Sequence, residues 1–426
     1  MLSSSSFSRR HRLPGGRPFR LLLGALATSS CGDWLYNVAL VTFVYERTHS
    51  GTWVALATAA RVLPIVLLGP LGGVMADRHN RRTLMIASDF LRAGLMVALA
   101  AVAGAGLPVF LAPVLAGAAT AVASVQPPCV AASTARLVAE SDLQRANALR
   151  SAIGQGAIVV GPALGAVILL ATSPAAAILL NGLTFIVSAA AILAIPAGPE
   201  FAPPEAATGT ASSVLGDIAV GARALRGAPV AIRLLSADIL CSAVYGMLTV
   251  TFVLLSRKIG AGNSGYGLLL GAYGIGGLIG ATLTGRMSSA ARWRPTLIAA
   301  LLLIATTLVI LGSISNLIDA LAASLLVGGG MVVGEVLSDT ALPSMLDDDV
   351  LARAYGLAFP ASLGGIVAGS LLAGPLVSLL GIAGAFTATG FTVLVVCGLL
   401  TRRPLAPAVA VPAAGWTVQD RDAVTR

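Results

Sequence analysis

Long apolar segments alternate with short polar connections along almost the whole chain. Each apolar segment is close to the roughly 20 residues that a helix needs to cross the hydrocarbon core of a bilayer. The pattern therefore predicts an all-α integral membrane protein with about twelve membrane-spanning helices. The expected spans are 19–45, 52–75, 84–105, 107–131, 149–171, 173–195, 229–256, 264–285, 295–314, 317–342, 355–379 and 381–400.

A polar stretch rich in proline and alanine separates the first six predicted helices from the last six. Short matches between these halves recur at an offset of 208 or 209 residues: Val41-Thr42-Phe43-Val44 as Val250-Thr251-Phe252-Val253, and Arg145-Ala146 as Arg353-Ala354. We therefore expect two related six-helix bundles. The predicted parts are a basic cytoplasmic tail at 1–18, an N-terminal bundle at 19–196, a central cytoplasmic loop at 197–228, a C-terminal bundle at 229–401 and a cytoplasmic tail at 402–426.

Basic residues indicate which ends of the predicted helices face the cytoplasm. Arginines gather in the even-numbered connections, whereas the odd-numbered connections are mostly a few residues long and poor in basic residues. Cytoplasmic loops of membrane proteins carry an excess of Lys and Arg. We therefore expect a multi-pass protein of the cytoplasmic membrane, with an even number of crossings and both termini in the cytoplasm.

Composition limits the function classes. A hydrophobic content of 57%, a charged content of 11% and a mean hydropathy of +0.90 exclude a chain of soluble domains. The net charge of +9 comes from arginines at the ends of apolar spans, so nucleic-acid binding is not expected. The three histidines lie in a tail or in loops, so we expect no metal site, no cofactor and no enzymatic activity. The four cysteines are interpreted as small buried residues: Cys31, Cys129, Cys241 and Cys397.

The most specific motif is the charged connection between the second and third spans. In Gly73-Val74-Met75-Ala76-Asp77-Arg78-His79-Asn80-Arg81-Arg82, the glycine is expected to let two helix ends approach, the Asp to pair with a basic neighbour, and Asn80 to adopt a left-handed turn. The connection resembles the signature of the major facilitator superfamily, with Asn80 at the place of its second glycine. The resemblance implies two bundles around a midplane substrate site. It also implies a conformational latch made by Gly73, Asp77, Arg78, Arg81 and Arg82.

Ionisable residues within the predicted spans are candidates for coupling or substrate binding, because charge inside hydrocarbon is costly. Asp33 lies near mid-depth of the first span, on one helix face with Asn37. Burial would favour its neutral form, as a proton carrier or a counter-ion for a cationic substrate requires. A structural Asp is the alternative. Arg61 needs a carboxylate from another helix, and pairing with Asp33 would keep that Asp charged.

Asp238 and Glu335 lie in the seventh and tenth spans, which line the cavity in the family that the chain resembles. For Asp238, a coupling or binding role and a structural role both stay open, and for Glu335 we favour a gate. Gln126 opens Gln126-Pro127-Pro128, which interrupts the fourth span by a simple kink or by exposing carbonyl groups to a cavity. Asp89 and Arg92, three residues apart, are interpreted as a mainly structural pair.

The fifth span contains Gly161-Pro162-Ala163-Leu164-Gly165, a small-residue stripe with a proline that predicts close helix packing. Gly161, Pro162 and Gly165 also resemble the core of a signature of proton-driven exporters. Further stretches resemble the subgroup that contains macrolide-efflux proteins and the enterobactin exporter, among them Cys31-Gly32-Asp33-Trp34 and Ser88-Asp89-Phe90-Leu91-Arg92-Ala93. One departure is that the fourth span lacks the arginine of many drug–proton antiporters.

The sequence predicts a secondary transporter that exports an amphipathic small molecule, such as an antibiotic or a siderophore, in exchange for protons. Expected partners are the substrate, protons and the lipid bilayer, and the expected state is a monomer. Uptake by symport or uniport on the same fold is the alternative, followed by a sensor that does not transport.

Overall fold

The computed structural model describes residues 16–203, 229–287, 293–341 and 348–401. Every regular element within these ranges is a helix. The elements of the first half are α1 (Gly16–Thr48), α2 (Gly51–Arg78), α3 (Arg81–Gly104), α4 (Leu111–Ala123), α5 (Gln126–Leu137), η2 (Glu140–Asp142), α6 (Leu143–Ala171), α7 (Pro174–Leu193) and η3 (Pro199–Phe201). Those of the second half are α9 (Pro229–Lys258), α10 (Gly262–Met287), α11 (Trp293–Ser313), α12 (Leu317–Ala341) and α13 (Asp348–Thr401).

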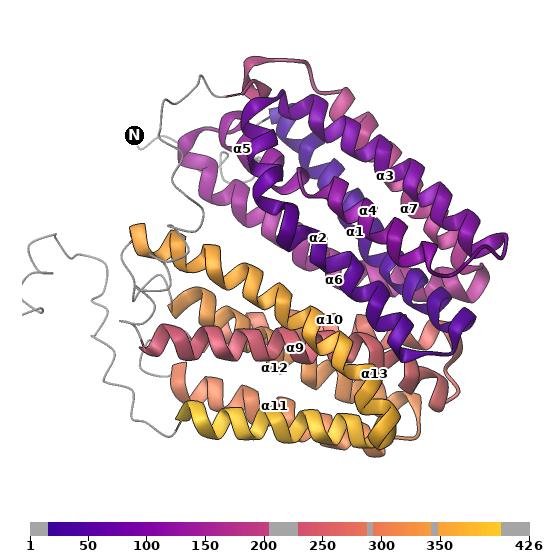
Figure 1. Cartoon of the computed structure of the whole chain (residues 1–426). Helices are drawn as coiled ribbons and strands as arrows, with labels where there is room; N and C mark the ends of the chain where they lie inside the picture. Colours follow the sequence, from indigo (N-terminus) through magenta and orange to yellow (C-terminus); the bar gives the residue numbers. More distant parts are fainter. Residues whose placement is uncertain (1–15, 204–228, 288–292, 342–347, 402–426) are drawn as a thin grey trace, which may run out of the picture.

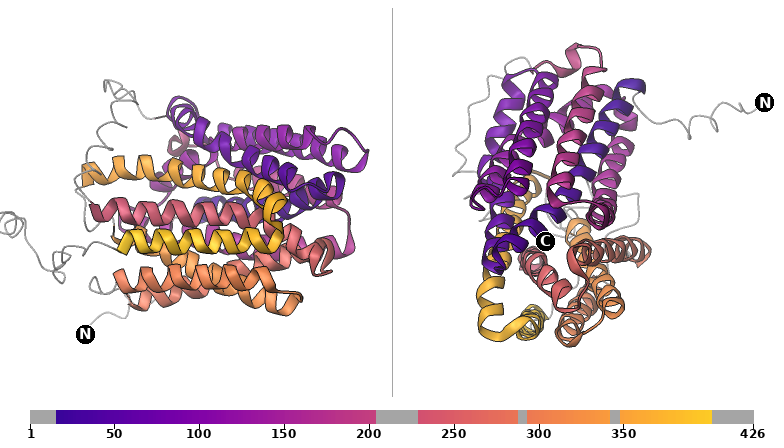
Figure 2. Two further views of the ribbon diagram at one scale, coloured as in Figure 1. Left: turned by 60° about the horizontal axis from the view of Figure 1, so that its bottom comes forward. Right: turned by 90° about the vertical axis from the view of Figure 1, so that its right-hand side faces the viewer.

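The helices form two groups that lie side by side. Figure 1 shows α1 to α7 together on one side and α9 to α13 on the other, and the two views in Figure 2 show the same division. Contact between the groups is made chiefly by α6 with α10 and by α2 with α13. The expected bounds of the two bundles and of the loop between them stay a prediction. Residues 1–15 of the predicted N-terminal tail, residues 204–228 of the predicted central loop and the whole predicted C-terminal tail lie outside the described residues.

Ten helical segments of the described chain are long and apolar enough to cross a membrane by length and composition. The last of them, Ala358–Leu400, is 43 residues long and lies within α13, where a non-helical residue, Gly381 (φ +70°), joins two helical segments. Only glycine adopts this backbone conformation without a steric cost. The break expected after residue 379 therefore lies at Gly381. Helix α1, 33 residues long, is not among the ten, so the count of twelve stays a prediction.

The fourth predicted span is divided into α4 and α5, with Ser124 and Val125 between them. The interruption expected at Gln126-Pro127-Pro128 is confirmed, because proline lacks the N–H that would continue the helix. A carbonyl near the break is satisfied from α3, where Ser88 Oγ donates a hydrogen bond to Val122 O at 3.0 Å. This hydrogen bond connects α3 with α4 beside the break.

Glycines allow the two halves to pack closely. A Cβ atom added at Gly267 of α10 would lie 2.9 Å from the carbonyl oxygen of Pro162 on α6, and one at Gly274 would lie 3.1 Å from Val159 Cα. On the other pair of helices, a Cβ at Gly374 of α13 would lie 3.2 Å from the backbone of Thr52. Such distances are shorter than normal van der Waals contact, so side chains at these positions would push the halves apart.

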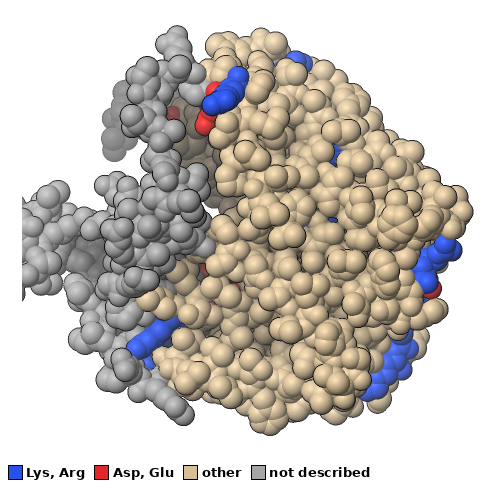
Figure 3. Space-filling model, in the orientation of Figure 1, with Lys and Arg blue, Asp and Glu red and all other residues tan. Residues whose placement is uncertain are grey.

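Large apolar side chains cover much of the outer surface. Leu67, Leu170 and Leu379 are 62%, 72% and 79% exposed, values that are unusual for a soluble protein but suit contact with lipid. Figure 3 shows that charged side chains occupy only scattered places on one face of the molecule. The four cysteines are free, and three of them are buried, as expected.

Candidate functional site

A cavity of about 540 Å³ lies between the two halves. Its volume is within the range of small-molecule sites in proteins. Residues of α1 and α6 line it from one side, and residues of α9, α10, α12 and α13 line it from the other. Most of the lining is apolar or aromatic. The polar and aromatic side chains of the lining are Trp34, Gln155, Asp238, Ser242, Tyr245, Tyr273, Glu335, Phe359 and Ser362.

Two carboxyl groups give the cavity its charge. Asp238 of α9 is partly buried and accepts a hydrogen bond from the hydroxyl group of Ser362 on α13. Glu335 of α12 is more exposed and lines the same cavity. No Lys or Arg is among the described lining residues. The cavity therefore combines an apolar, aromatic wall with negative charge, a combination that suits a cationic group on an apolar molecule.

The halves meet beyond one end of this cavity. In the last turns of α1 and α9, Arg257 Nη2 lies 3.2 Å from Glu46 Oε1, and the Arg257 guanidinium carbon is 5.9 Å from the ring centre of Tyr45. A Cβ at Gly51, the first residue of α2, would lie 3.4 Å from Val250 of α9. These contacts close the molecule at the end that the charge pattern assigns to the outside of the cell.

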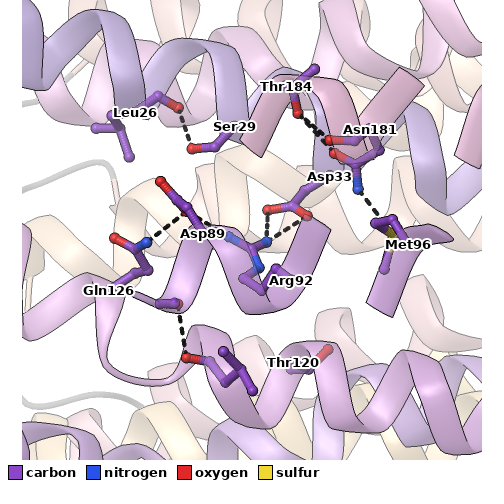
Figure 4. Close-up of polar contacts among 12 residues, drawn as sticks. Leu26, Ser29, Asp33, Asp89, Arg92, Met96, Thr120, Gln126, Asn181 and Thr184 are labelled. Carbon is purple, nitrogen blue, oxygen red and sulfur yellow. Dashed lines mark hydrogen bonds and ion pairs between the residues drawn. The ribbon is translucent and has the colours of Figure 1, made fainter. Parts of the chain in front are cut away.

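A second polar cluster lies inside the N-terminal half. Figure 4 shows Arg92 of α3 pointing between Asp33 of α1 and Asp89 of its own helix. Arg92 Nη2 is 2.6 Å from Asp33 Oδ2, and Arg92 Nη1 is 3.8 Å from Asp89 Oδ1. Gln126 Nε2 donates to Asp89 Oδ1 at 2.8 Å, and the ring of Phe185 lies 3.8 Å from the Arg92 guanidinium carbon. The cluster joins α1, α3, α5 and α7.

The partner of Arg61 differs from the one considered from the sequence. Its guanidinium donates a hydrogen bond to Asn37 Oδ1 and lies 5.2 Å from the ring centre of Tyr36. Asp33, one turn before Asn37, pairs with Arg92 instead. Among the five candidates for the cavity, Asp238 and Glu335 therefore line it, whereas Asp33, Asn37 and Gln126 belong to polar contacts within the N-terminal half.

The predicted latch lies where α2 ends and α3 begins. The expected pairing of Asp77 with a basic neighbour is present, because Arg81 Nη2 is 3.6 Å from Asp77 Oδ1. Arg81 is almost completely buried and also donates to Ala76 O at 3.1 Å. Arg82 Nη2 donates to Leu193 O at 2.8 Å, at the carboxyl end of α7, whereas Arg78 is exposed.

Two details of this connection differ from expectation. The close approach expected at Gly73 occurs at Gly72, where a Cβ would collide with the carbonyl group of Ser124; a Cβ at Gly73 would meet nothing within 4 Å. Asn80 does not take a left-handed turn. It has φ −62° and ψ 116° and caps α3, its Oδ1 accepting a hydrogen bond from Thr83 N at 3.2 Å. A helix N-cap requires an extended backbone, which explains the difference.

The glycine and proline motif of α6 packs against α1, as expected for small residues. A Cβ at Gly161 would lie 2.9 Å from Cys31 O, and one at Gly165 would lie 3.2 Å from Leu35 O. The carbonyl oxygen of Pro162 lies against Gly267 of α10. The motif therefore lies where α6 packs between α1 and α10.

Comparison with known proteins identifies the family. Residues 16–420 match the model of the major facilitator family described as transmembrane secretion effector. The chain belongs to this family. It is therefore a multi-pass membrane transporter of small molecules rather than an enzyme. This agrees with the superfamily that the signature between α2 and α3 indicated.

Curated relatives include proteins named as exporters. The chain is 25% identical to the bacilysin exporter BacE of Bacillus subtilis, over 91% of this chain and 93% of BacE. It is 26% identical to macrolide efflux protein A of Streptococcus pyogenes, over 35% and 37% of the two chains. It is 28% identical to the MFS-type transporter YfiS of Bacillus subtilis, over only 41% of each chain.

Solved structures share the fold. A mutant of the nucleoside transporter NupG superposes with a TM-score of 0.75 at 10% identity, covering 90% of this chain and 98% of that one. A bacterial homologue of the human lysosomal transporter Spinster, in an inward-facing and unoccupied conformation, gives a TM-score of 0.67 at 11% identity, covering 90% and 95%. At these identities the likeness concerns the fold alone.

Several cavity residues were not identified from the sequence, among them Trp34, Gln155, Tyr245, Tyr273 and Ser362. In a helix that is apolar on all sides, periodicity does not distinguish the face toward lipid from the face toward a cavity. Aromatic residues make up only 5% of the chain, so an aromatic residue close to an acid within a span could have indicated the cavity. Trp34 also follows Asp33 directly, and Tyr245 lies seven residues after Asp238.

Proposed function

We propose that the protein is a secondary transporter that exports an amphipathic, cationic small molecule across the cytoplasmic membrane in exchange for protons. The observation that carries the proposal is the cavity between the halves, with its aromatic wall and its two carboxyl groups, Asp238 and Glu335. Relatives named as exporters of bacilysin and of macrolides support the direction of transport.

Alternating access requires a central site that opens to each side in turn. With both termini in the cytoplasm, the contact between Glu46 and Arg257 closes the outer side, and the cavity faces inward. Twelve crossings follow when α1 and the two segments of α13 are each counted as spans. The latch of Gly73, Asp77, Arg78, Arg81 and Arg82 would then act at the cytoplasmic side.

Protons and substrate would share the carboxyl groups of the cavity. Asp33 is less suited to this role than the sequence suggested, because it forms an ion pair with Arg92 within the N-terminal half and is not among the residues that line the cavity. Among the described residues, the hydrogen-bond partner of the Asp238 side chain is the hydroxyl group of Ser362, and a hydroxyl group can donate or accept a hydrogen bond. Asp238 is therefore our candidate for the proton carrier, with Glu335 nearer the mouth.

Transport into everted membrane vesicles tests the proposal. Vesicles from cells that produce the protein should accumulate ethidium, a cationic apolar dye, when respiration imposes a pH gradient, and a protonophore should abolish the accumulation. Asp238→Asn should reduce it at least about tenfold, since the lost charge–charge interaction in a partly buried site is comparable with 1.4 kcal/mol. Erythromycin serves as a second probe.

The control is Glu140→Gln, which removes an exposed carboxyl group outside the cavity and should leave accumulation unchanged. Outward movement in everted vesicles, driven by the same gradient, would support uptake by symport instead. Equal accumulation with and without a gradient would support uniport. No difference from vesicles that lack the protein, for either probe, would count against the proposed substrate class.

A further inference from the structure

Arg61 is a cation in the interior of the membrane region, and no carboxyl group of the described residues forms an ion pair with it. It is the eleventh residue of α2, so a rise of 1.5 Å per residue places it roughly 15 Å from the start of the helix. None of the ion pairs formed among the described residues includes Arg61. Its hydrogen-bond partner is the neutral side chain of Asn37.

Arg92 provides the comparison within the same half of the molecule. It is also buried in the membrane region, and two carboxyl groups balance its charge, Asp33 at 2.6 Å and Asp89 at 3.8 Å. A charged side chain at the centre of a bilayer costs several kcal/mol unless it is paired or hydrated. Two carboxyl groups therefore balance the charge of Arg92, whereas Arg61 forms no ion pair among the described residues.

Two buried phenol hydroxyl groups lie beside Arg61 and its partner Asn37. The Arg61 guanidinium carbon is 5.2 Å from the ring centre of Tyr36. The hydroxyl oxygen of Tyr36 faces Arg61 and that of Tyr266 of α10 faces Asn37, but neither makes a well-aligned hydrogen bond with the described residues. A buried hydroxyl group without a well-aligned partner is rare, because it loses its hydrogen bonds to water. Arg61 and these two hydroxyl groups therefore gather around Asn37, between the halves.

This place adjoins the central cavity. Arg61 is not itself among the lining residues, but its partner Asn37 lies on α1 three residues after Trp34, which lines the cavity. Tyr266 lies on α10 seven residues before Tyr273, and Tyr245 of α9 also lines the cavity. The ring of Tyr245 packs on Tyr273, another lining residue, with the ring centres 5.6 Å apart. Arg61 is only partly buried.

We propose that Arg61, with the hydroxyl groups of Tyr36 and Tyr266, forms an anion-binding subsite that holds a carboxylate group of the transported molecule. A guanidinium group offers paired donors that match the two oxygens of a carboxylate, and tyrosine hydroxyl groups complete the coordination. The substrate is then zwitterionic, its cationic group held by Asp238 and Glu335 and its carboxylate held by Arg61. The assignment of this carboxylate to the substrate rests on the proposed transport function, whereas anion binding at Arg61 does not.

Binding of benzoate to the purified full chain in lipid nanodiscs tests the subsite, with benzamide as a neutral molecule of the same shape. Benzoate should bind saturably by scintillation proximity, and benzamide should compete at least about tenfold more weakly, as expected when a charge-assisted pair of about 1.5–3 kcal/mol is lost. Arg61→Gln should weaken benzoate binding by at least the same factor. Tyr36→Phe, which removes only a hydroxyl group, should weaken it about two- to tenfold.

Arg47→Gln is the matched control, because Arg47 is exposed and lies in the last turn of α1, away from the cluster. Its benzoate binding should equal that of the unchanged protein. Arg61→Lys keeps the charge and should retain part of the binding, and a single symmetrical size-exclusion peak for each variant excludes misfolding. Absence of saturable benzoate binding, equal binding of benzoate and benzamide, or full binding by Arg61→Gln would each overturn the subsite.

The two proposals fail separately. If Arg61-dependent benzoate binding is found while vesicles show no gradient-driven transport, the anion subsite stands and the exporter function falls. If vesicles transport ethidium while Arg61→Gln binds benzoate normally, the subsite falls and the exporter function stands.

Discussion

Asp33 of α1 and Arg92 of α3 form an ion pair in which one guanidinium nitrogen lies 2.7 Å and 2.6 Å from the two carboxylate oxygens. The Arg92 side chain is 7% exposed and that of Asp33 36% exposed, so the pair is partly shielded from water. Arg92 also lies against Phe185 of α7. The pair and the ring of Phe185 therefore connect three helices of the N-terminal half and hold Asp33 within that half.

The first prediction is that Asp33→Asn destabilises the protein. The remaining partner of Arg92 would be Asp89 at 3.8 Å, and loss of a charged partner from a partly buried group costs about 1–3 kcal/mol. Thermal unfolding of the purified protein, followed by size-exclusion chromatography after heating, should show a lower midpoint than for Glu140→Gln. If Asp33 carried the proton instead, the variant would lose the pH dependence of transport and keep the original midpoint.

The second prediction uses two neighbouring glycines of α2. Gly72→Ala should destabilise the protein by about 1–3 kcal/mol, because the added methyl group collides with the carbonyl group of Ser124 at the break between α4 and α5. Gly73→Ala should be tolerated, since nothing lies within 4 Å of a Cβ at that position. The amount of folded protein in the membrane measures both effects. Similar yields for both variants would contradict the packing role of Gly72.

The helices could be predicted from the sequence because each span is a long apolar run with charged ends. The chain breaks at Gln126-Pro127-Pro128 and at Gly381 follow from backbone chemistry that the sequence displays. Pairing between helices could not be predicted in this way. Nothing in the spacing of Asp33, Arg61 and Arg92 indicates which arginine meets the Asp, because the answer depends on how α1, α2 and α3 are rotated against one another.

The candidate site was predictable only in part for the same reason. Asp238 and Glu335 are conspicuous as acids within apolar spans, and both line the cavity. Ser362 and Tyr245 are ordinary residues in such helices, and they acquire significance only through Asp238 and the cavity that they border. The signature pattern begins at Gly73 and therefore predicts the close approach there. The rotation of α2, which the sequence does not reveal, turns Gly72 toward Ser124 instead.

The third prediction concerns the latch. Asp77 is 67% exposed, and an exposed ion pair contributes only about 0–1 kcal/mol to stability, so Asp77→Ala should fold normally. We expect transport to be lost nonetheless, because Arg81 is buried and its charge would lose the carboxylate that holds it in one conformation. Accumulation in vesicles, divided by the amount of protein in the same membranes, measures this effect. Transport at the level of the unchanged protein would remove Asp77 from the latch.

The fourth prediction concerns the contact that closes the molecule at the end of α1. Glu46 and Arg257 come from different halves, so the ion pair at 3.2 Å is broken whenever the halves separate on this side. Glu46→Arg and Arg257→Glu each replace attraction by repulsion and should shift the population toward the state open at this end. The combination of both substitutions restores opposite charges and should reverse the shift.

Labelling of Val250→Cys by a maleimide reagent reports this opening, because Val250 is completely buried and lies against Gly51 at the closed end. In a background without the four native cysteines, each single charge reversal should raise the labelling rate about two- to fivefold, the factor that corresponds to a partly exposed ion pair of about 0.4–1 kcal/mol. The double variant should return the rate to its original value. Equal rates in all four proteins would mean that the ion pair forms without holding the halves together, and closure would then depend on the glycine contacts of α2 with α9 and α13.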